Sequence, residues 1–150
     1  MSENFEIKKL DSADLKFARE FFRFFKDDDG EENPTFLSDA YLTKLLKRED
    51  FHVFVALEDG KFAGGLTAYE LMKYNAETTE MFLYEIGVEP EYQRRGIAAA
   101  LVERLKAVCA EKGIREMFVA TEPDNLPALG LYEKTGGKAS EFVNFDYVIE

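Results

Sequence analysis

The stretch Gln93-Arg94-Arg95-Gly96-Ile97-Ala98 places two arginines and a glycine between a predicted strand and a predicted helix. The strand is expected over residues 80–88, and apolar residues recur at helical spacing from Ile97 to Val108. Gly96 can adopt a positive φ, and the unpaired N–H groups at the start of a helix attract an anion. The pattern therefore predicts a loop that binds a pyrophosphate. The alternative is a basic loop within an ordinary strand-to-helix connection.

The composition of the chain indicates one globular domain over residues 1–150. Hydrophobic residues make up 46% of the 150 residues, which is enough to bury a sizeable core. No stretch approaches the ~18 apolar residues of a membrane-spanning helix, and the N-terminus lacks the basic and then apolar pattern of a secretory signal. We therefore expect a cytoplasmic protein that does not span a membrane.

The net charge of −11 restricts the possible partners. Proteins bind nucleic acids largely by neutralising phosphates with lysine and arginine, so this charge argues against a nucleic-acid partner. It favours a small cationic partner, provided that carboxylates converge on the binding site. The alternative is that the acidic residues serve only solubility.

The single cysteine and the single histidine leave little scope for metal chemistry. Cys109 lies on the apolar side of its predicted helix and is expected to be a buried thiol. His52 is expected to be a half-exposed residue of a strand over residues 51–57. Because a zinc site of the usual kind needs several His or Cys ligands, we expect no metal.

The predicted elements follow a pattern typical of a mixed α/β fold around one sheet. An Asp-Gly pair at residues 59–60 predicts a hairpin, and the glycine at 87 is compatible with a bulge. The acidic segment 27–34 is expected to form a loop. Strands are expected over residues 5–10, 51–57, 61–71, 80–88, 116–120 and 140–149, and helices over residues 13–25, 38–47, 97–112 and 126–135.

The first predicted helix carries an excess of phenylalanine between residues 17 and 25. These side chains are more than one helix face can bury in a small domain. Part of this surface is expected to meet substrate or a second subunit, and the segment 140–149 is also apolar. We therefore predict a homodimer. The alternative is a core that is simply aromatic.

A second spaced pattern, Asn125-x-x-Ala128-x-x-x-Tyr132-x-x-x-Gly136, follows later in the chain. On a helix, Asn125 and Tyr132 lie on one face, about 10 Å apart. Such a face can run along an extended ligand. In this order and spacing, the two patterns together resemble the GNAT acetyltransferases.

The resemblance implies the GNAT fold, which is a mixed, largely antiparallel central sheet with a splayed strand pair, flanked by about four helices. It also implies acetyl-CoA as co-substrate, with backbone amides of the splayed strand facing the acetyl and pantetheine groups. The cofactor-binding residues implied in this way are Ile86, Gly87, Val88, Gln93, Arg94, Arg95, Gly96, Ile97, Ala98, Asn125 and Ala128.

Catalytic and acceptor-binding residues are also expected. The resemblance gives Tyr132 the role of the acid that protonates the departing thiolate, and the alternative is a core tyrosine with a hydrogen-bonded hydroxyl. Glu85 stands in an apolar run, where an unpaired carboxylate is costly and often has a task, and it is expected to help deprotonate the attacked amine. Each candidate acid could also be an ordinary surface residue. The residues expected to bind the acceptor are Glu85, Glu122, Asp124 and Asp146.

Longer strings narrow the resemblance to the aminoglycoside 3-N-acetyltransferases of the gentamicin acetyltransferase type. That family acetylates a polycationic aminosugar at its 3-amino group, which implies direct transfer to an acceptor in an acidic cleft. The similarity spans about residues 37–150, and its most particular strings are residues 82–88, 127–136 and 144–147.

The sequence departs from that family at three positions. Glu85 and Glu122 stand where the family has aspartates, and the extra methylene moves each carboxylate outward. Gly137 replaces a bulky residue. Two other functions remain open: a GNAT enzyme that acetylates another small polyamine or a protein amine, and a non-catalytic acyl-CoA-binding sensor module.

Overall fold

The computed structural model of the protein describes residues 4–28 and 37–150, with the side chains of residues 26–28 left aside. The chain divides into two compact units, Met1–Ala120 and Thr121–Glu150. Most of the acidic segment predicted as a loop lies outside the described residues. Its first two residues, Asp27 and Asp28, belong instead to a helix.

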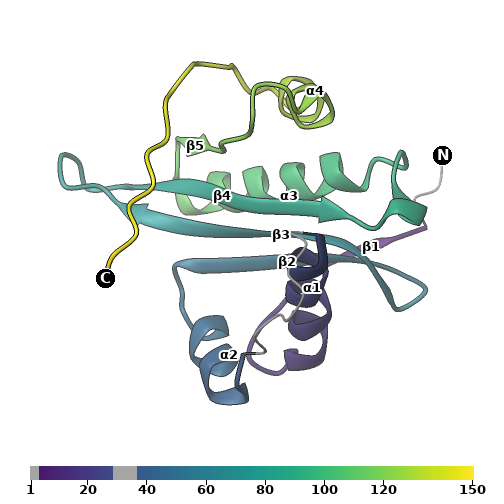
Figure 1. The fold of residues 1–150 in the computed structure, drawn as a ribbon. Helices are drawn as coiled ribbons and strands as arrows, with labels where there is room; N and C mark the ends of the chain where they lie inside the picture. Colours follow the sequence, from purple (N-terminus) through teal and green to yellow (C-terminus); the bar gives the residue numbers. More distant parts are fainter. Residues whose placement is uncertain (1–3, 29–36) are drawn as a thin grey trace. The chain divides into compact units, whose positions relative to one another are not determined.

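The first unit is built on a five-stranded sheet with the strand order β1-β2-β3-β4-β5 (Figure 1). The strands from β1 to β4 are antiparallel to their neighbours, whereas β5 runs parallel to β4. The prediction of a mixed, largely antiparallel sheet is therefore confirmed. The strands are β1 (Glu6–Lys9), β2 (Phe51–Glu58), β3 (Lys61–Met72), β4 (Thr79–Val88) and β5 (Met117–Phe118).

Helices cover both faces of this sheet. Figure 1 shows α1 and α2 on one face and α3 on the other. The predicted ends are confirmed where local chemistry is strong: Ser38 caps α2 by accepting a hydrogen bond from the Tyr41 N–H at 3.1 Å, and Gly113 ends α3 at φ 72°. The helices of this unit are α1 (Leu15–Asp28), α2 (Asp39–Leu46) and α3 (Ile97–Lys112), with a short 3-10 helix η1 (Pro90–Tyr92).

The aromatic side chains of α1 form part of the core. Phe21 is fully buried, and its ring centroid lies 5.5 Å from that of Phe62 on β3. Phe17, Phe22, Phe24 and Phe25 pack around the same cluster. These four side chains are only partly buried, and Phe24 also lines a pocket beside Gly87, so the expectation that part of this surface meets substrate or a subunit stays a prediction.

The second unit contains one helix, α4 (Leu126–Lys134), followed by an extended segment. The predicted strand over residues 140–149 is wrong, since this part of the described chain is neither helix nor strand. β-propensity alone cannot stabilise a strand without a hydrogen-bonded partner strand. The apolar side chains of the segment are 76–89% exposed, and they are Phe142, Val143, Phe145, Tyr147, Val148 and Ile149.

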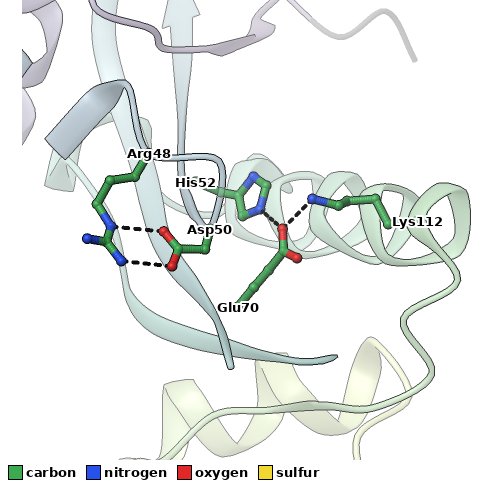
Figure 2. Close-up of polar contacts among 5 residues, drawn as sticks. All are labelled: Arg48, Asp50, His52, Glu70 and Lys112. Carbon is green, nitrogen blue, oxygen red and sulfur yellow. Dashed lines mark hydrogen bonds and ion pairs between the residues drawn. The ribbon is translucent and has the colours of Figure 1, made fainter. Parts of the chain in front are cut away.

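His52 differs from its prediction because it is buried rather than half-exposed. It is 2% exposed on β2, and its Nε2 lies 2.6 Å from the Glu70 carboxylate of β3. Lys112, near the end of α3, donates to the same carboxylate oxygen at 2.5 Å (Figure 2). A sheet-to-helix polar network therefore takes the place of the solvent contact that the sequence suggested. Cys109 is buried, as predicted.

Burial controls the protonation of this network. Desolvation lowers the pKa of His52 below its ordinary value of 6.5, outweighing the opposite effect of Glu70, and the nearby Lys9 and Lys112 lower it further. Burial alone would raise the pKa of Glu70, but the hydrogen bonds from Lys112 and His52 bring it below the ordinary 4.5. The folded protein therefore holds a neutral imidazole that donates its Nε2–H to an ionised carboxylate.

This network predicts acid sensitivity. Because the pKa of His52 is lower in the folded chain, the unfolded chain binds more protons at this residue as the pH falls below 6.5. The contribution of neutral His52 to the free energy of unfolding is therefore complete above pH 6.5. It is lost as the pH falls toward the pKa of the folded state. The pKa of Glu70 is also lower in the folded chain, so its contribution to the free energy of unfolding is lost as the pH falls below 4.5. Thermal unfolding should show the Tm of the parent falling just below pH 6.5, with a flatter profile for His52→Gln. Equal slopes for the two proteins would contradict the assignment.

Candidate functional site

The loop before α3 presents a row of backbone N–H groups that lack acceptors. Arg94 and Gly96 both adopt left-handed conformations, with φ 65° and 82°. No N–H group from Arg94 to Ala99 has a hydrogen-bond acceptor within the described residues, and the helix start has no side-chain cap. Such an arrangement at a helix N-terminus binds anions. The structure thus favours an anion-binding loop over an ordinary connection.

Side-chain contacts hold this loop in place. The Gln93 amide donates to the Val88 carbonyl at 3.0 Å, which ties the loop to the end of β4. Arg95 pairs with Glu58 of β2 at 2.7 Å and lies over the Tyr92 ring, 5.3 Å from its centroid. Two of the predicted ligand side chains therefore have structural partners here. The Arg94 side chain has none within the described residues, so its charge is available to a ligand.

A pocket of about 790 Å³ opens beside the loop. One wall is the end of β4 and the chain just after it, from Gly87 to Pro90, with Gln93. The opposite wall comes from α1 and includes Lys16, Arg19 and Arg23. These three cations were missed in the sequence, although their spacing of three and then four residues places them on one helix face.

The α1 cations differ in how they are engaged. Arg19 donates to the Leu37 carbonyl at 2.7 Å and also pairs with Asp39, so it joins α1 to the start of α2. Lys16 makes no hydrogen bond or ion pair within the described residues. The pocket therefore offers at least one uncommitted cation, although Glu20 and Glu89 also line it.

β5 is shorter than the predicted strand over residues 116–120, so its pairing with β4 ends near the middle of β4. β5 pairs only with Met81 and Phe82, whereas the pairing of β4 with β3 continues to Val88. From Leu83 onward, one edge of β4 is therefore unpaired by the described strands. Ile86 and Val88, predicted to face the cofactor, lie on this part of the strand.

The bulge in β4 lies at Tyr84 and not at Gly87. Thr67 pairs with Glu85 while the next residue, Ala68, pairs with Leu83, so Tyr84 is the extra residue. Gly87 is regularly paired with Gly65. A Cβ atom on Gly87 would lie 2.7 Å from the Phe24 ring, which explains the glycine by close packing rather than by a bulge.

Glu85 lies beside the bulge, in a partly buried position among tyrosines. Its carboxylate is close enough to Tyr69 to influence the titration of that residue. Burial is the main cause that raises the pKa of Tyr69 above 10.0, and Tyr84, Tyr41 and Glu85 add to it. The structure thus places the predicted base opposite Thr67 of β3, two residues from Tyr69.

The remaining predicted residues belong to the second unit. Asn125 caps α4 by accepting a hydrogen bond from the Ala128 N–H at 3.2 Å, so these two residues have a structural role. Glu122 and Asp124 are exposed on the segment before the helix. Asp146 is exposed and accepts a hydrogen bond from the Asn144 amide at 3.1 Å.

Tyr132 is half-buried on α4. Burial raises the pKa of its hydroxyl above the ordinary 10.0, so the group, which is protonated at neutral pH in any case, loses its proton less readily. Within the described residues the hydroxyl has no hydrogen-bond partner, whereas a core tyrosine of the alternative kind would have one. Gly137 closes the helix end by donating its N–H to the Tyr132 carbonyl at 2.8 Å.

The described residues offer neither a metal site nor a membrane-spanning helix. No group of three or more His, Cys, Asp or Glu residues there could hold a metal ion. None of the helices that the structure describes has both the length and the apolar character needed to cross a membrane.

Comparison with known proteins places these features in a family. Residues 16–137 match the model of the acetyltransferase (GNAT) family. A putative [ribosomal protein bS18]-alanine N-acetyltransferase of Bacillus subtilis is 30% identical over 98 residues, or 65% of this chain. The chain spans 61% of the length of that curated relative.

Solved structures extend the similarity over nearly the whole chain. The aminoglycoside acetyltransferase meta-AAC0020, from an uncultured soil metagenomic sample, superposes with a TM-score of 0.93 at 31% identity. The match covers 98% of this chain and 97% of the other, and that protein was crystallised with trehalose and with sisomicin. The fold is also shared with the aminoglycoside N-acetyltransferase AAC(6')-Iy in complex with CoA, at 22% identity and a TM-score of 0.79, covering 99% and 97% of the two chains. On the strength of the family match, this chain belongs to the GNAT acetyltransferases, whose co-substrate is acetyl-CoA.

Proposed function

We propose that this chain transfers the acetyl group of acetyl-CoA directly to an amine of an aminoglycoside, at the 3-amino position. The observation that carries the proposal is the row of free N–H groups before α3, next to an unpaired edge of β4. The likeness to meta-AAC0020 over nearly the full chain supports the class of acceptor. An enzyme of this kind in a bacterial host would confer antibiotic resistance.

The loop and strand residues are proposed to hold acetyl-CoA, which supplies the thioester-bound acetyl group. The N–H groups of Arg94 to Ala98 and the Arg94 guanidinium fit the charge and shape of a pyrophosphate. The unpaired edge at residues 86–88 offers backbone groups for an amide-containing arm. Arg95 and Gln93 then act mainly by fixing the loop through their contacts with Glu58 and Val88.

Tyr132 is proposed to protonate the departing thiolate. Its hydroxyl carries its proton at neutral pH, as an ordinary phenol does, and burial raises its pKa further above 10.0. A neutral phenol can donate a proton to a developing thiolate, and a positioned acid of this kind accelerates transfer. Asn125 and Ala128, at the start of the same helix, are proposed to contact the cofactor in addition to their capping bond.

The acidic residues are proposed to bind the acceptor. Glu85 would take a proton from the attacked amine, directly or through water, while Glu122, Asp124 and Asp146 would bind its other ammonium groups. The chain's net charge of −11 adds a long-range attraction for a polycation.

Organisation and location are further proposals. We propose that the two units form a single acetyltransferase domain and that the protein acts in the cytoplasm. A homodimer is proposed because the apolar side chains at residues 142–149 are exposed. Light scattering at micromolar concentration tests it, and a monomeric mass would contradict it.

A second candidate acceptor is the N-terminal amine of a protein. The similarity to the putative ribosomal-protein-alanine acetyltransferase favours it, although it covers only 65% of the chain. The non-catalytic sensor is the third candidate. The neutral, unpartnered Tyr132 hydroxyl argues against it, since mere binding does not need an acid.

Gly96→Asp should abolish acetyl-CoA binding, because it puts a negative charge among the N–H groups. Gly113→Asp is a matched control: both glycines have positive φ, a Cβ added at either would meet no atom within 4 Å, and they lie at opposite ends of α3. Each change should cost about 1–2 kcal/mol of stability through backbone strain. Calorimetry should show binding only for Gly113→Asp. Equal binding by both variants would refute the loop assignment.

Tyr132→Phe should lower kcat by about 100- to 10,000-fold, because it removes the proton donor. Calorimetry should show nearly unchanged affinity for acetyl-CoA. The control is Tyr147→Phe, which removes a hydroxyl from an exposed residue of the same unit. An unchanged kcat in Tyr132→Phe would assign the proton to water.

An acceptor screen that detects free thiol tests the substrate class. The parent should acetylate gentamicin faster than spermidine or an alanine-starting peptide, and added salt should slow the reaction by screening the attraction. Glu85→Gln should lower kcat/KM far more than Glu80→Gln, a matched change on the same strand. Turnover of the peptide alone would favour the protein acceptor, and absence of any turnover would favour the sensor.

A further inference from the structure

A series of aromatic rings crosses the sheet on the face that carries α1 and α2. Tyr69 contacts Phe51, a member of the core cluster, with ring centroids 4.8 Å apart. The Tyr69 and Tyr84 rings meet edge to face at 5.4 Å. Tyr84 then contacts Phe82 at 5.4 Å, and Phe82 stacks on Phe118 of β5 at 4.6 Å. The rings thus support one another from β3 to β5.

Tyr84 is the ring of this series that leaves much of its area open, since it is 52% exposed. A fixed aromatic surface therefore runs from Phe51 to Phe118, and its open ring lies in the middle of β4, beyond the end of the pairing with β5.

The β4 bulge explains how an acid comes to this surface. In a regular strand, Tyr84 and Glu85 would point to opposite faces of the sheet. A bulge re-aims one side chain. Here Glu85 pairs with Thr67, which lies two residues before Tyr69 and so on the same face of β3, and Tyr84 contacts the Tyr69 ring on that face. An open tyrosine ring and a carboxylate are therefore neighbours on one face.

We propose that Tyr84, with Glu85, forms a subsite that selects acceptors in which the amine is carried on a six-membered ring. The inference rests on the proposed function and adds the basis of its specificity. The ring of an aminosugar or aminocyclitol would lie on Tyr84 with its C–H groups against the aromatic face. Its ammonium group would be attracted by Glu85 and by the negative faces of the tyrosine rings.

The chemistry of the surface favours this occupant over a linear one. Rings that are held by neighbouring rings lose little conformational freedom when a flat ligand face packs on them. A linear polyamine has no such face and would be bound through charge alone. Tyr84 should therefore affect the affinity for ring-shaped amines and leave that for linear amines unchanged.

The test combines two substitutions of Tyr84 with a matched control. Tyr84→Leu keeps apolar bulk without the ring, and Tyr84→Phe keeps the ring without the hydroxyl. Tyr74→Leu makes the same change as the first at a residue that is 99% exposed. Calorimetry without acetyl-CoA measures the Kd of gentamicin and of spermidine, and steady-state kinetics measures both KM values.

Tyr84→Leu should raise the Kd and KM for gentamicin by about three- to tenfold, as expected for the loss of one aromatic contact. The spermidine values, and those of Tyr74→Leu, should match the parent, and Tyr84→Phe, which keeps the ring, should weaken gentamicin less than Tyr84→Leu does. Equal weakening of both amines by Tyr84→Leu, or no weakening of either, would overturn the subsite while leaving the proposed aminoglycoside activity intact. A parent that neither binds nor acetylates gentamicin would overturn both the subsite and the proposed acceptor.

Discussion

The close packing of α1 on two glycines of the sheet is the constraint on which the site depends. A Cβ atom on Gly65 would lie 2.9 Å from the Phe21 ring, and one on Gly87 would lie 2.7 Å from the Phe24 ring. Gly64 is equally restricted, since its Cβ would lie 2.7 Å from the Gly87 carbonyl oxygen. Larger residues would push α1 away from β3 and β4. The glycines therefore set the distance between the cations of α1 and the end of β4, and with it the width of the pocket.

Helix α3 is fixed to the sheet at both of its ends. Just before its start, Arg95 pairs with Glu58 of β2, and near its end Lys112 pairs with the buried Glu70 of β3. His52 shares the second carboxylate, which leaves the pair with little freedom to move. Burying such charges costs desolvation energy, so the network contributes more to a defined helix position than to net stability. A defined position is what the free N–H groups at the start of α3 require in order to bind an anion.

Local chemistry explains which parts of the structure could be predicted from sequence. The Asp59-Gly60 turn, the Ser38 cap and the Gly113 helix end depend on short-range conformational preferences, and all three were predicted. The left-handed conformation of Gly96 belongs to the same class.

The burial of His52 was missed because its partners, Glu70 and Lys112, are remote in sequence. Gly87 was judged compatible with a bulge, and the bulge at Tyr84 was missed for the same reason: only the pairing with β3 shows that the extra residue is Tyr84. The segment 140–149 was misassigned because strand propensity does not supply a pairing partner.

The proposed ligands have opposite charges, which places a demand on the electrostatics of this chain. With a net charge of −11, the protein as a whole repels an anionic cofactor and attracts a cationic acceptor. At physiological ionic strength, however, exposed charges are screened over about 8 Å, so the groups nearest to each ligand decide its binding. Around the loop these groups are the N–H dipoles, Arg94 and the cations of α1, together with Glu20 and Glu89 of the same pocket, and around the bulge they include Glu85 and tyrosine rings. The first unit thus places its free N–H groups and its cations near the loop, and Glu85 near the bulge of the same strand, β4. The overall charge can then increase the encounter rate of a cationic acceptor without preventing the cofactor from binding.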